Sequence, residues 1–142
     1  MKTLPMKKIE DENDVRNHIV HEAEADHWHV SHIESGTTSP GIPDLALSKN
    51  DVTLWLEIKV MKNGEVSMRP PQRRWHRKQA AAGGRSFVLA YINNRLHPIK
   101  GSTAAQLIPK SVTWWAGDGW EIGRVKDLLR NLALGRAPLI DQ

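Results

Sequence analysis

Apolar side chains occupy every second position from Val52 to Val60. A period of two is the pattern of a β-strand that turns one face to the core, and a helix of this sequence would scatter the same side chains around its circumference. We therefore expect a strand over residues 52–60. Glu57 and Lys59 then project together from the opposite face of this strand, roughly 6 to 7 Å apart.

A second strand is expected just before this one. Pro43 lacks the N–H that a strand ladder needs, so the strand begins after it and covers Asp44 to Leu47. The polar residues 48–51 form a turn that folds this strand back onto the next one. The hairpin predicts that Asp44 lies near Glu57 and Lys59.

Two carboxylates and a lysine in this arrangement are suited to metal-assisted cleavage of a phosphodiester. Asp44 and Glu57, with the Ile58 carbonyl between them, would offer hard oxygen ligands to a Mg²⁺ ion that keeps several waters. The ion would polarise the scissile phosphate and lower the pKa of a bound water, while Lys59 would orient that water or offset charge in the transition state. The plainer alternative is a solvated strand face and a turn residue, because a Pro-Asp, gap, Glu-x-Lys pattern is weak by itself.

Flanking residues strengthen the hydrolytic interpretation. Gly41 precedes the Pro-Asp pair, an apolar strand surrounds Glu57, and Gln72 followed by Trp75 opens the next expected helix. Over roughly residues 12–92 this combination resembles the PD-(D/E)xK nuclease superfamily. It is most similar to the small stand-alone VRR-NUC nucleases and, more distantly, to archaeal Holliday-junction resolvases.

The resemblance implies an α/β fold with a restriction-endonuclease-like core, in which a mixed central β-sheet is flanked by helices. It also implies a set of site residues around a Mg²⁺ ion, with Mn²⁺ as a substitute. In this set Asp44 and Glu57 are metal ligands, Lys59 is the catalytic lysine and Gln72 is a supporting polar residue.

Family members also carry an acidic residue in the first helix. The matching position here is Asp14, a further metal ligand, with Glu12 as the competing assignment. The chain departs from the family in lacking the usual Glu at this position. It also departs at residues 69–71, where Arg-Pro-Pro stands in place of a more usual Ser-Pro cap.

Basic side chains gather between residues 59 and 85, where Glu65 is the only acid. Those expected to bind nucleic acid are Lys62, Arg69, Arg73, Arg74, Arg77 and Lys78. Pro70-Pro71 and Gly83-Gly84 bound a helix that places several of these like charges one turn apart, which destabilises a free helix slightly. Phosphates of a bound partner would relieve that repulsion. The alternative is a helix charged for solubility.

The remaining pattern predicts one domain over residues 1–142, with a core over about 12–92 and a C-terminal extension over about 93–142. A first helix is expected at 12–25, and the sheet and helices are completed by strands 28–33, 87–92, 96–99 and 112–115 and by helices 103–107 and 125–134. The chain has no cysteine and no apolar run of the length of a membrane span, so we expect a cytoplasmic protein without a membrane partner.

These patterns together predict a Mg²⁺-dependent endodeoxyribonuclease that acts on branched DNA such as Holliday junctions. The alternatives are a nickase, a restriction-like nuclease or an exonuclease of the same chemistry, or a DNA-binding module without catalysis. Paired cuts need two sites, so a homodimer is expected. The candidate material for the contact is Trp114 or Trp115, Trp120, the leucines Leu128, Leu129, Leu132 and Leu134, and the tail residues 138–140. Leu128 and Leu132 are expected to face the core, which leaves Leu129 and the tail for the interface.

Overall fold

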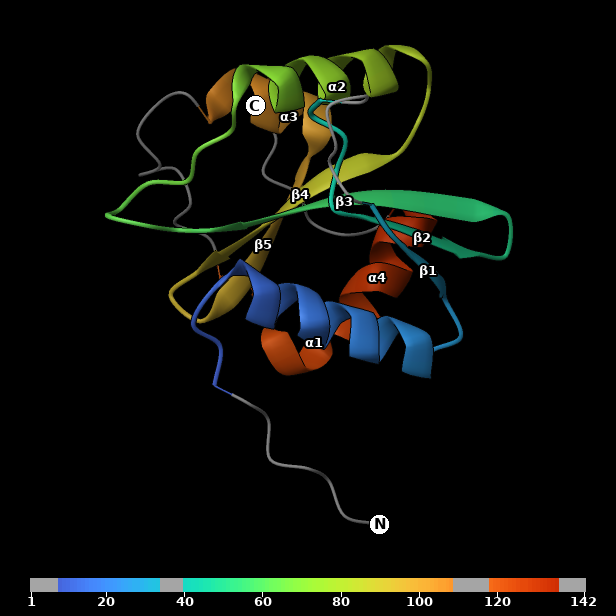
Figure 1. Cartoon of the computed structure of the whole chain (residues 1–142). Coiled ribbons are helices and arrows are strands. Elements are labelled where there is room, and N and C mark those ends of the chain that lie inside the picture. The colour runs from blue at the N-terminus through green and yellow to red at the C-terminus, as the bar shows by residue number, and fades with distance from the viewer. Residues whose placement is uncertain (1–7, 34–39, 109–117, 136–142) are drawn as a thin grey trace.

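The strand predicted from the period of two lies in the middle of a six-stranded sheet (Figure 1). The structure, a computed structural model, describes residues 8–33, 40–108 and 118–135. Its elements in chain order are α1 (Glu12–Ala25), β1 (His29–His32), β2 (Leu45–Lys49), β3 (Val52–Val60), α2 (Pro70–Ala81), β4 (Ser86–Ile92), β5 (Arg95–Lys100), α3 (Gly101–Leu107), β6 (Trp120–Glu121), a 3-10 turn (Ile122–Arg124) and α4 (Val125–Leu134).

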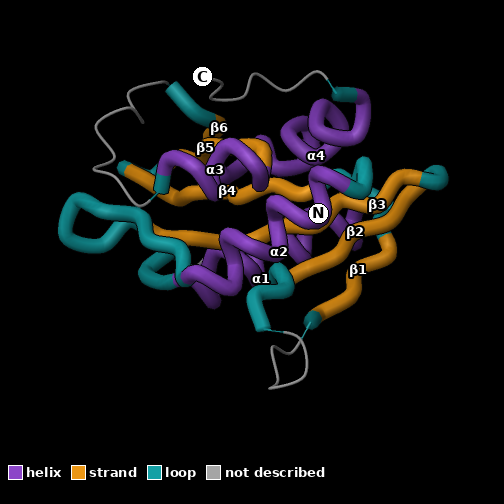
Figure 2. Tube along the Cα trace, turned by 90° about the horizontal axis from the view of Figure 1, so that it is seen from above, coloured by secondary structure: helices purple, strands orange, loops and turns teal. Residues whose placement is uncertain are grey.

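The sheet is mixed. Its spatial order follows the chain from β1 to β6, as the strands running side by side in Figure 2 show. Neighbouring strands are antiparallel except β3 and β4, which are parallel because α2 carries the chain back across the sheet between them. The predicted α/β fold with a mixed central sheet flanked by helices is confirmed.

Helices cover both faces of the sheet, with α2 and α3 on one side and α1 and α4 on the other (Figure 1). The alternation in β3 divides its side chains between these two layers. Leu54, Leu56 and Ile58 are fully buried in the core that includes α1 and α4. On the other face, Trp55, Glu57 and Lys59 lie beside side chains of α2, so the side of β3 that carries the charged residues is covered by a helix.

The part of the chain after residue 92 is built into the same sheet and core. Strand β5 pairs with β4 along its whole length, and α4 packs against α1 and β3. Leu128, Leu129 and Leu132 are all buried in the core with α1. The expectation that Leu129 is exposed and free for a dimer contact is therefore wrong. Helix α4 packs against both α1 and β3, so leucines on two adjacent sides of the helix are buried.

A glycine fixes the approach of the Pro-Asp segment to α2. Gly41 has φ +87°, and a Cβ at this position would lie 2.1 Å from the backbone oxygen of Pro71. Only glycine tolerates both the left-handed backbone and this close approach. The first turn of α2 therefore packs directly on the chain that leads into Asp44.

Most predicted boundaries agree with the structure within one or two residues. Helix α1 covers 12–25 as predicted, whereas β2 begins at Leu45 instead of Asp44 and α3 begins at Gly101. The predicted strand 112–115, with Trp114 and Trp115, and the tail 138–140 lie outside the described residues. Within the described residues, no helix has the length and apolar character needed to cross a membrane.

Candidate active site

Asp44 and Glu57 meet across the β2–β3 hairpin, as predicted. The register pairs Leu45 with Leu56, so Asp44, just before β2, lies opposite Glu57. The backbone N–H of Ile58 donates a hydrogen bond to Asp44 Oδ2 at 2.9 Å. This bond holds the Asp44 carboxylate beside the Glu57 backbone. On its other side, Asp44 Oδ1 lies 3.6 Å from Arg16 Nη2 of α1.

Glu57 is a buried carboxyl group, with only 2% of the residue exposed. Among the described residues, its Oε1 atom has no hydrogen-bond partner. Burial, followed by the neighbouring negative charge of Asp44, raises the pKa of Glu57 from 4.5 to about 9. A cation near this carboxylate would stabilise its charged form, as the charge of Lys59 already does in part. The burial of Glu57 excludes the solvated strand face that the sequence left as an alternative.

Lys59 and Gln72 are brought together, although they come from different elements. Lys59 Nζ donates to Gln72 Oε1 at 3.0 Å, and the same oxygen accepts the backbone N–H of Arg69 at 2.9 Å. Gln72 therefore satisfies an N–H at the start of α2 and holds the lysine ammonium group on the site face of β3.

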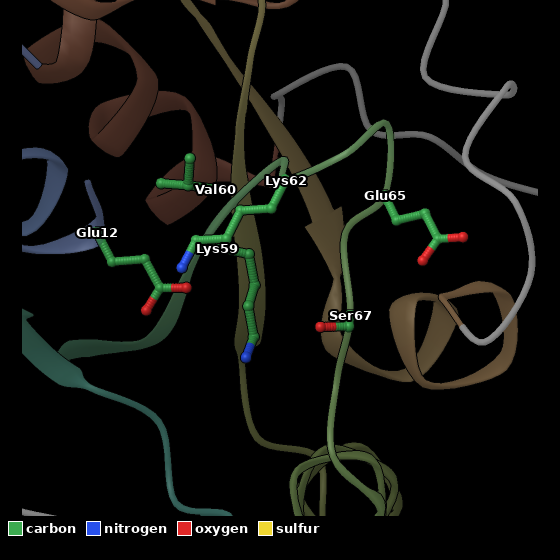
Figure 3. Close-up of a pocket in the computed structure, with 6 residues that line it drawn as sticks. All are labelled: Glu12, Lys59, Val60, Lys62, Glu65 and Ser67. Atoms are coloured by element: carbon green, nitrogen blue, oxygen red, sulfur yellow. The ribbon is translucent and has the colours of Figure 1, made fainter. Parts of the chain in front are cut away.

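A cavity of about 140 Å³ opens beside Lys59 (Figure 3). Glu12 lines it from α1, and Lys62, Glu65 and Ser67 line it from the segment after β3. The Glu12 charge also contributes to the raised pKa of Glu57. The cavity therefore joins the first turn of α1 to the end of β3 that carries the catalytic candidates.

The two first-helix candidates differ in position. Glu12 lines this cavity, whereas the Asp14 carboxylate accepts the backbone N–H of Glu10 at 2.8 Å. Within the described residues, no cluster of three or more Asp, Glu, His or Cys side chains is preassembled to hold a metal. The fit for Mg²⁺ instead consists of two facing carboxyl groups, Asp44 just before β2 and Glu57 on β3, and Mg²⁺ accepts few protein ligands because it keeps its waters.

The sequence reasoning missed His76, which lies one helical turn after Gln72. Its side chain is fully buried, its Nδ1 lies 2.8 Å from Ser86 Oγ, and its Nε2 lies 4.0 Å from Glu57 Oε1. Burial, and then the charge of Lys59, lowers the pKa of His76 to about 4, so the ring is neutral at physiological pH. The i,i+4 spacing from Gln72 puts both residues on one helix face, but spacing alone does not show that the fold buries this face.

The basic residues that were expected to bind nucleic acid lie around this site on the outside of α2 and in the segment before it. Lys62, Arg69, Arg74, Arg77 and Lys78 are exposed, and Arg73 is half-buried. Trp75 of α2 packs on Trp55 of β3, with ring centroids 5.4 Å apart, and this contact anchors the helix to the sheet. The charged side of α2 thus faces outward while its polar side covers Glu57.

Comparison with solved structures identifies the fold. The chain is similar to a structure described as a VRR_NUC domain, with 19% sequence identity and a TM-score of 0.51 over 84% of this chain and 94% of that one. It is also similar to Hjc, a Holliday junction resolvase from the archaeal hyperthermophile Archaeoglobus fulgidus, with 11% identity and a TM-score of 0.51 over 63% of this chain and 76% of that one. No family model and no curated protein sequence matches the chain. The likeness confirms the fold that the resemblance to the PD-(D/E)xK superfamily implied.

Proposed function

We propose that this protein is a metal-dependent endonuclease that hydrolyses phosphodiester bonds of branched DNA such as four-way junctions. The observation that carries the proposal is the buried Glu57 carboxyl group, which lies opposite Asp44 and on the same strand face as Lys59. A buried acid with a pKa near 9 weakens the apo protein unless a cation binds there. The fold shared with a Holliday junction resolvase supports the choice of a branched substrate.

Each residue has a distinct role in this proposal. Asp44, Glu57 and the Ile58 carbonyl hold a Mg²⁺ ion, for which Mn²⁺ can substitute. When bound, the ion supplies Lewis-acid activation of the phosphate and of a water. Lys59 stabilises the negative charge that develops on the phosphate, and Gln72 orients the lysine through the 3.0 Å hydrogen bond.

For the first-helix carboxylate, the position of Glu12 in the cavity favours Glu12 over Asp14. Glu12 would bind the ion through an intervening water, since the cavity that it lines is bounded by Lys59 and not by Asp44 or Glu57 themselves. Asp14 remains assigned to the N-terminus of α1, where its carboxylate already accepts a backbone N–H.

DNA binding is assigned to the outer side of α2 and the segment before it. The six basic residues there are Lys62, Arg69, Arg73, Arg74, Arg77 and Lys78. Their ammonium and guanidinium groups would contact phosphates on either side of the scissile bond, which positions the strand without reading its sequence.

The experiment incubates the purified protein with plasmid, linear duplex, flap and four-way-junction DNA in Mg²⁺, Mn²⁺ or EDTA. We expect cleavage of the junction that requires a divalent ion. Asp44→Asn and Glu57→Gln should each reduce the rate at least about 100-fold, because two protein carboxylates are close to the minimum that holds a hydrated ion. Glu24→Gln, which changes an exposed acid of α1, is the matched control and should cleave as the wild type does.

Binding measured in EDTA separates catalysis from affinity. Lys59→Met should retain junction affinity while turnover falls. Replacing Arg73, Arg74 and Arg77 by Gln should weaken binding and lower its salt dependence by about one unit of slope for each lost phosphate contact. Arg124→Gln, an exposed charge beside α4, is the control for this change.

The outcome decides among the alternatives. Cleavage of one strand only would identify a nickase, and cutting of plain duplex would identify a restriction-like enzyme. Binding without cleavage in either ion would contradict the proposal and leave a DNA-binding module.

A further inference from the structure

A continuous line of side chains lies between α2 and the sheet and consists of Ser86, His76 and Glu57. Ser86 Oγ and His76 Nδ1 are 2.8 Å apart, and His76 Nε2 and Glu57 Oε1 are 4.0 Å apart. The three residues come from β4, α2 and β3, so the line crosses two neighbouring strands and the helix above them. Its inner end is the carboxyl group proposed to hold the metal.

The outer end of this line is closed by backbone. A Cβ at Gly101, the first residue of α3, would lie 2.3 Å from His76 Nδ1 and 2.3 Å from Ser86 Oγ. The backbone of α3 thus packs directly on the Ser86–His76 pair and leaves no room for a water there. Ser86 is consequently the side chain that satisfies Nδ1, and the imidazole ring is held in one orientation.

The inner end of the line has two buried atoms without partners. In the part of the chain that the structure describes, His76 Nε2 and Glu57 Oε1 both lack a hydrogen bond, and each is inaccessible to solvent. Buried polar atoms are nearly always paired, so two such atoms only 4.0 Å apart mark a contact that forms in another state of the site. A shift of about 1 Å would bring them to hydrogen-bond distance.

We propose that His76 is a positioning residue for Glu57. Ser86 donates its hydroxyl proton to Nδ1, which leaves the proton of the neutral ring on Nε2, and Nε2–H donates to Glu57 Oε1 when the metal binds. The other carboxylate oxygen is then directed at the ion. The inference rests on the proposed metal site, and it assigns α2 two positioning contacts one turn apart: Gln72 to Lys59 and His76 to Glu57.

A contact of this kind is tested by the affinity for the metal. The thermal unfolding midpoint is measured against Mn²⁺ and Mg²⁺ concentration without DNA, for the wild type, His76→Leu, His76→Gln and Ser86→Ala. We expect His76→Leu to need about 10- to 100-fold more metal for the same stabilisation, the usual effect of removing a partner of a metal ligand. His76→Gln keeps an N–H donor and should recover most of the affinity, and Ser86→Ala should give a smaller loss. His97→Gln, a change at another buried histidine, is the control and should leave the metal dependence unchanged.

The rescue by Gln distinguishes positioning from packing, because Leu fills the space equally well but cannot donate. Equal metal dependence of the wild type and His76→Leu would overturn the proposal, and so would equal losses in His76→Leu and His76→Gln. If His76→Leu does not fold, Ser86→Ala carries the test: a measurable loss of metal affinity relative to the wild type is expected, and equal metal dependence of Ser86→Ala and the wild type overturns the proposal. A wild type that gains no stability from either ion also overturns it. A wild type that binds metal but cuts no DNA would refute the proposed function alone.

Discussion

Replacing Glu57 by Gln should stabilise the apo protein, by an amount that grows with pH. The folded protein holds the Glu57 proton up to a pKa of about 9, whereas an ordinary Glu releases it at 4.5. Between these values the unfolded chain binds fewer protons than the folded one, so the stability of the wild type falls as pH rises. Gln has nearly the same shape and no proton to lose, so the variant lacks this dependence.

The size of the stability difference between the two proteins follows from the shift in the pKa of Glu57. Each pH unit between the two pKa values changes the free energy of unfolding by at most about 1.4 kcal/mol, which gives about 3 kcal/mol between about pH 5 and about pH 7.5. For a domain of this size that is a difference of about 10 °C in the unfolding midpoint. Titrating groups that do not interact with Glu57 are common to both proteins and cancel in the comparison.

Thermal or urea unfolding in EDTA across this range measures the difference directly. The two proteins should have similar stability near pH 5, and the variant should be clearly more stable near pH 7.5. A wild-type-minus-variant difference that stays constant with pH would refute the argument, because it would show that the folded protein does not hold the Glu57 proton.

Two further outcomes concern stability and assembly. Arg130 donates to both carboxylate oxygens of Asp26, at 3.0 and 2.7 Å, and this contact, with Lys49 nearby, lowers the pKa of Asp26 despite its burial. Asp26→Asn should lower the unfolding midpoint by a few degrees at neutral pH, and the deficit should vanish as acid protonates Asp26 below its depressed pKa; a deficit that persists in acid would contradict the ion pair as its cause. We also expect light scattering to report twice the 16.0 kDa of one chain, since paired cuts need two sites and Leu134 of α4 is 63% exposed; a monomer that makes paired cuts would contradict the dimer.

The sequence was sufficient for strands β1 to β5 because its signals there are local, whereas β6 was not predicted. The period of two over 52–60 and the polar turn before it determine which residues face each other, and from them the meeting of Asp44 with Glu57 follows. The helix limits also followed from local signals, with Pro70-Pro71 at the start of α2 and glycines just after its end. These features depend on neighbours along the chain, which a sequence displays directly.

The burial of Leu129 and the role of His76 could not be predicted in the same way. Leu129 is buried because α4 is enclosed by α1 and β3, which are distant in the chain. His76 acquires its neighbours from β3 and β4 only once α2 has crossed back over the sheet. Both outcomes depend on how much of a helix surface is buried by neighbouring elements. The spacing of side chains along the sequence does not give that extent.

Helix α2 shows why the prediction from sequence was incomplete at the candidate site. Its two buried side chains are Gln72 and His76, which are polar, whereas a helix that packs on a sheet usually buries an apolar stripe. The apolar cluster on this side of the sheet is built instead from strand residues, from Ala104 and Ile108 in and after α3, and from Val66 and Met68 before α2. A polar inner face contributes less hydrophobic stabilisation than an apolar one. Its side chains lie instead against Lys59 and Glu57, the residues that the proposed chemistry needs in fixed positions. The departure from ordinary amphipathic packing is therefore itself an argument that α2 was selected to position the site as well as to complete the fold.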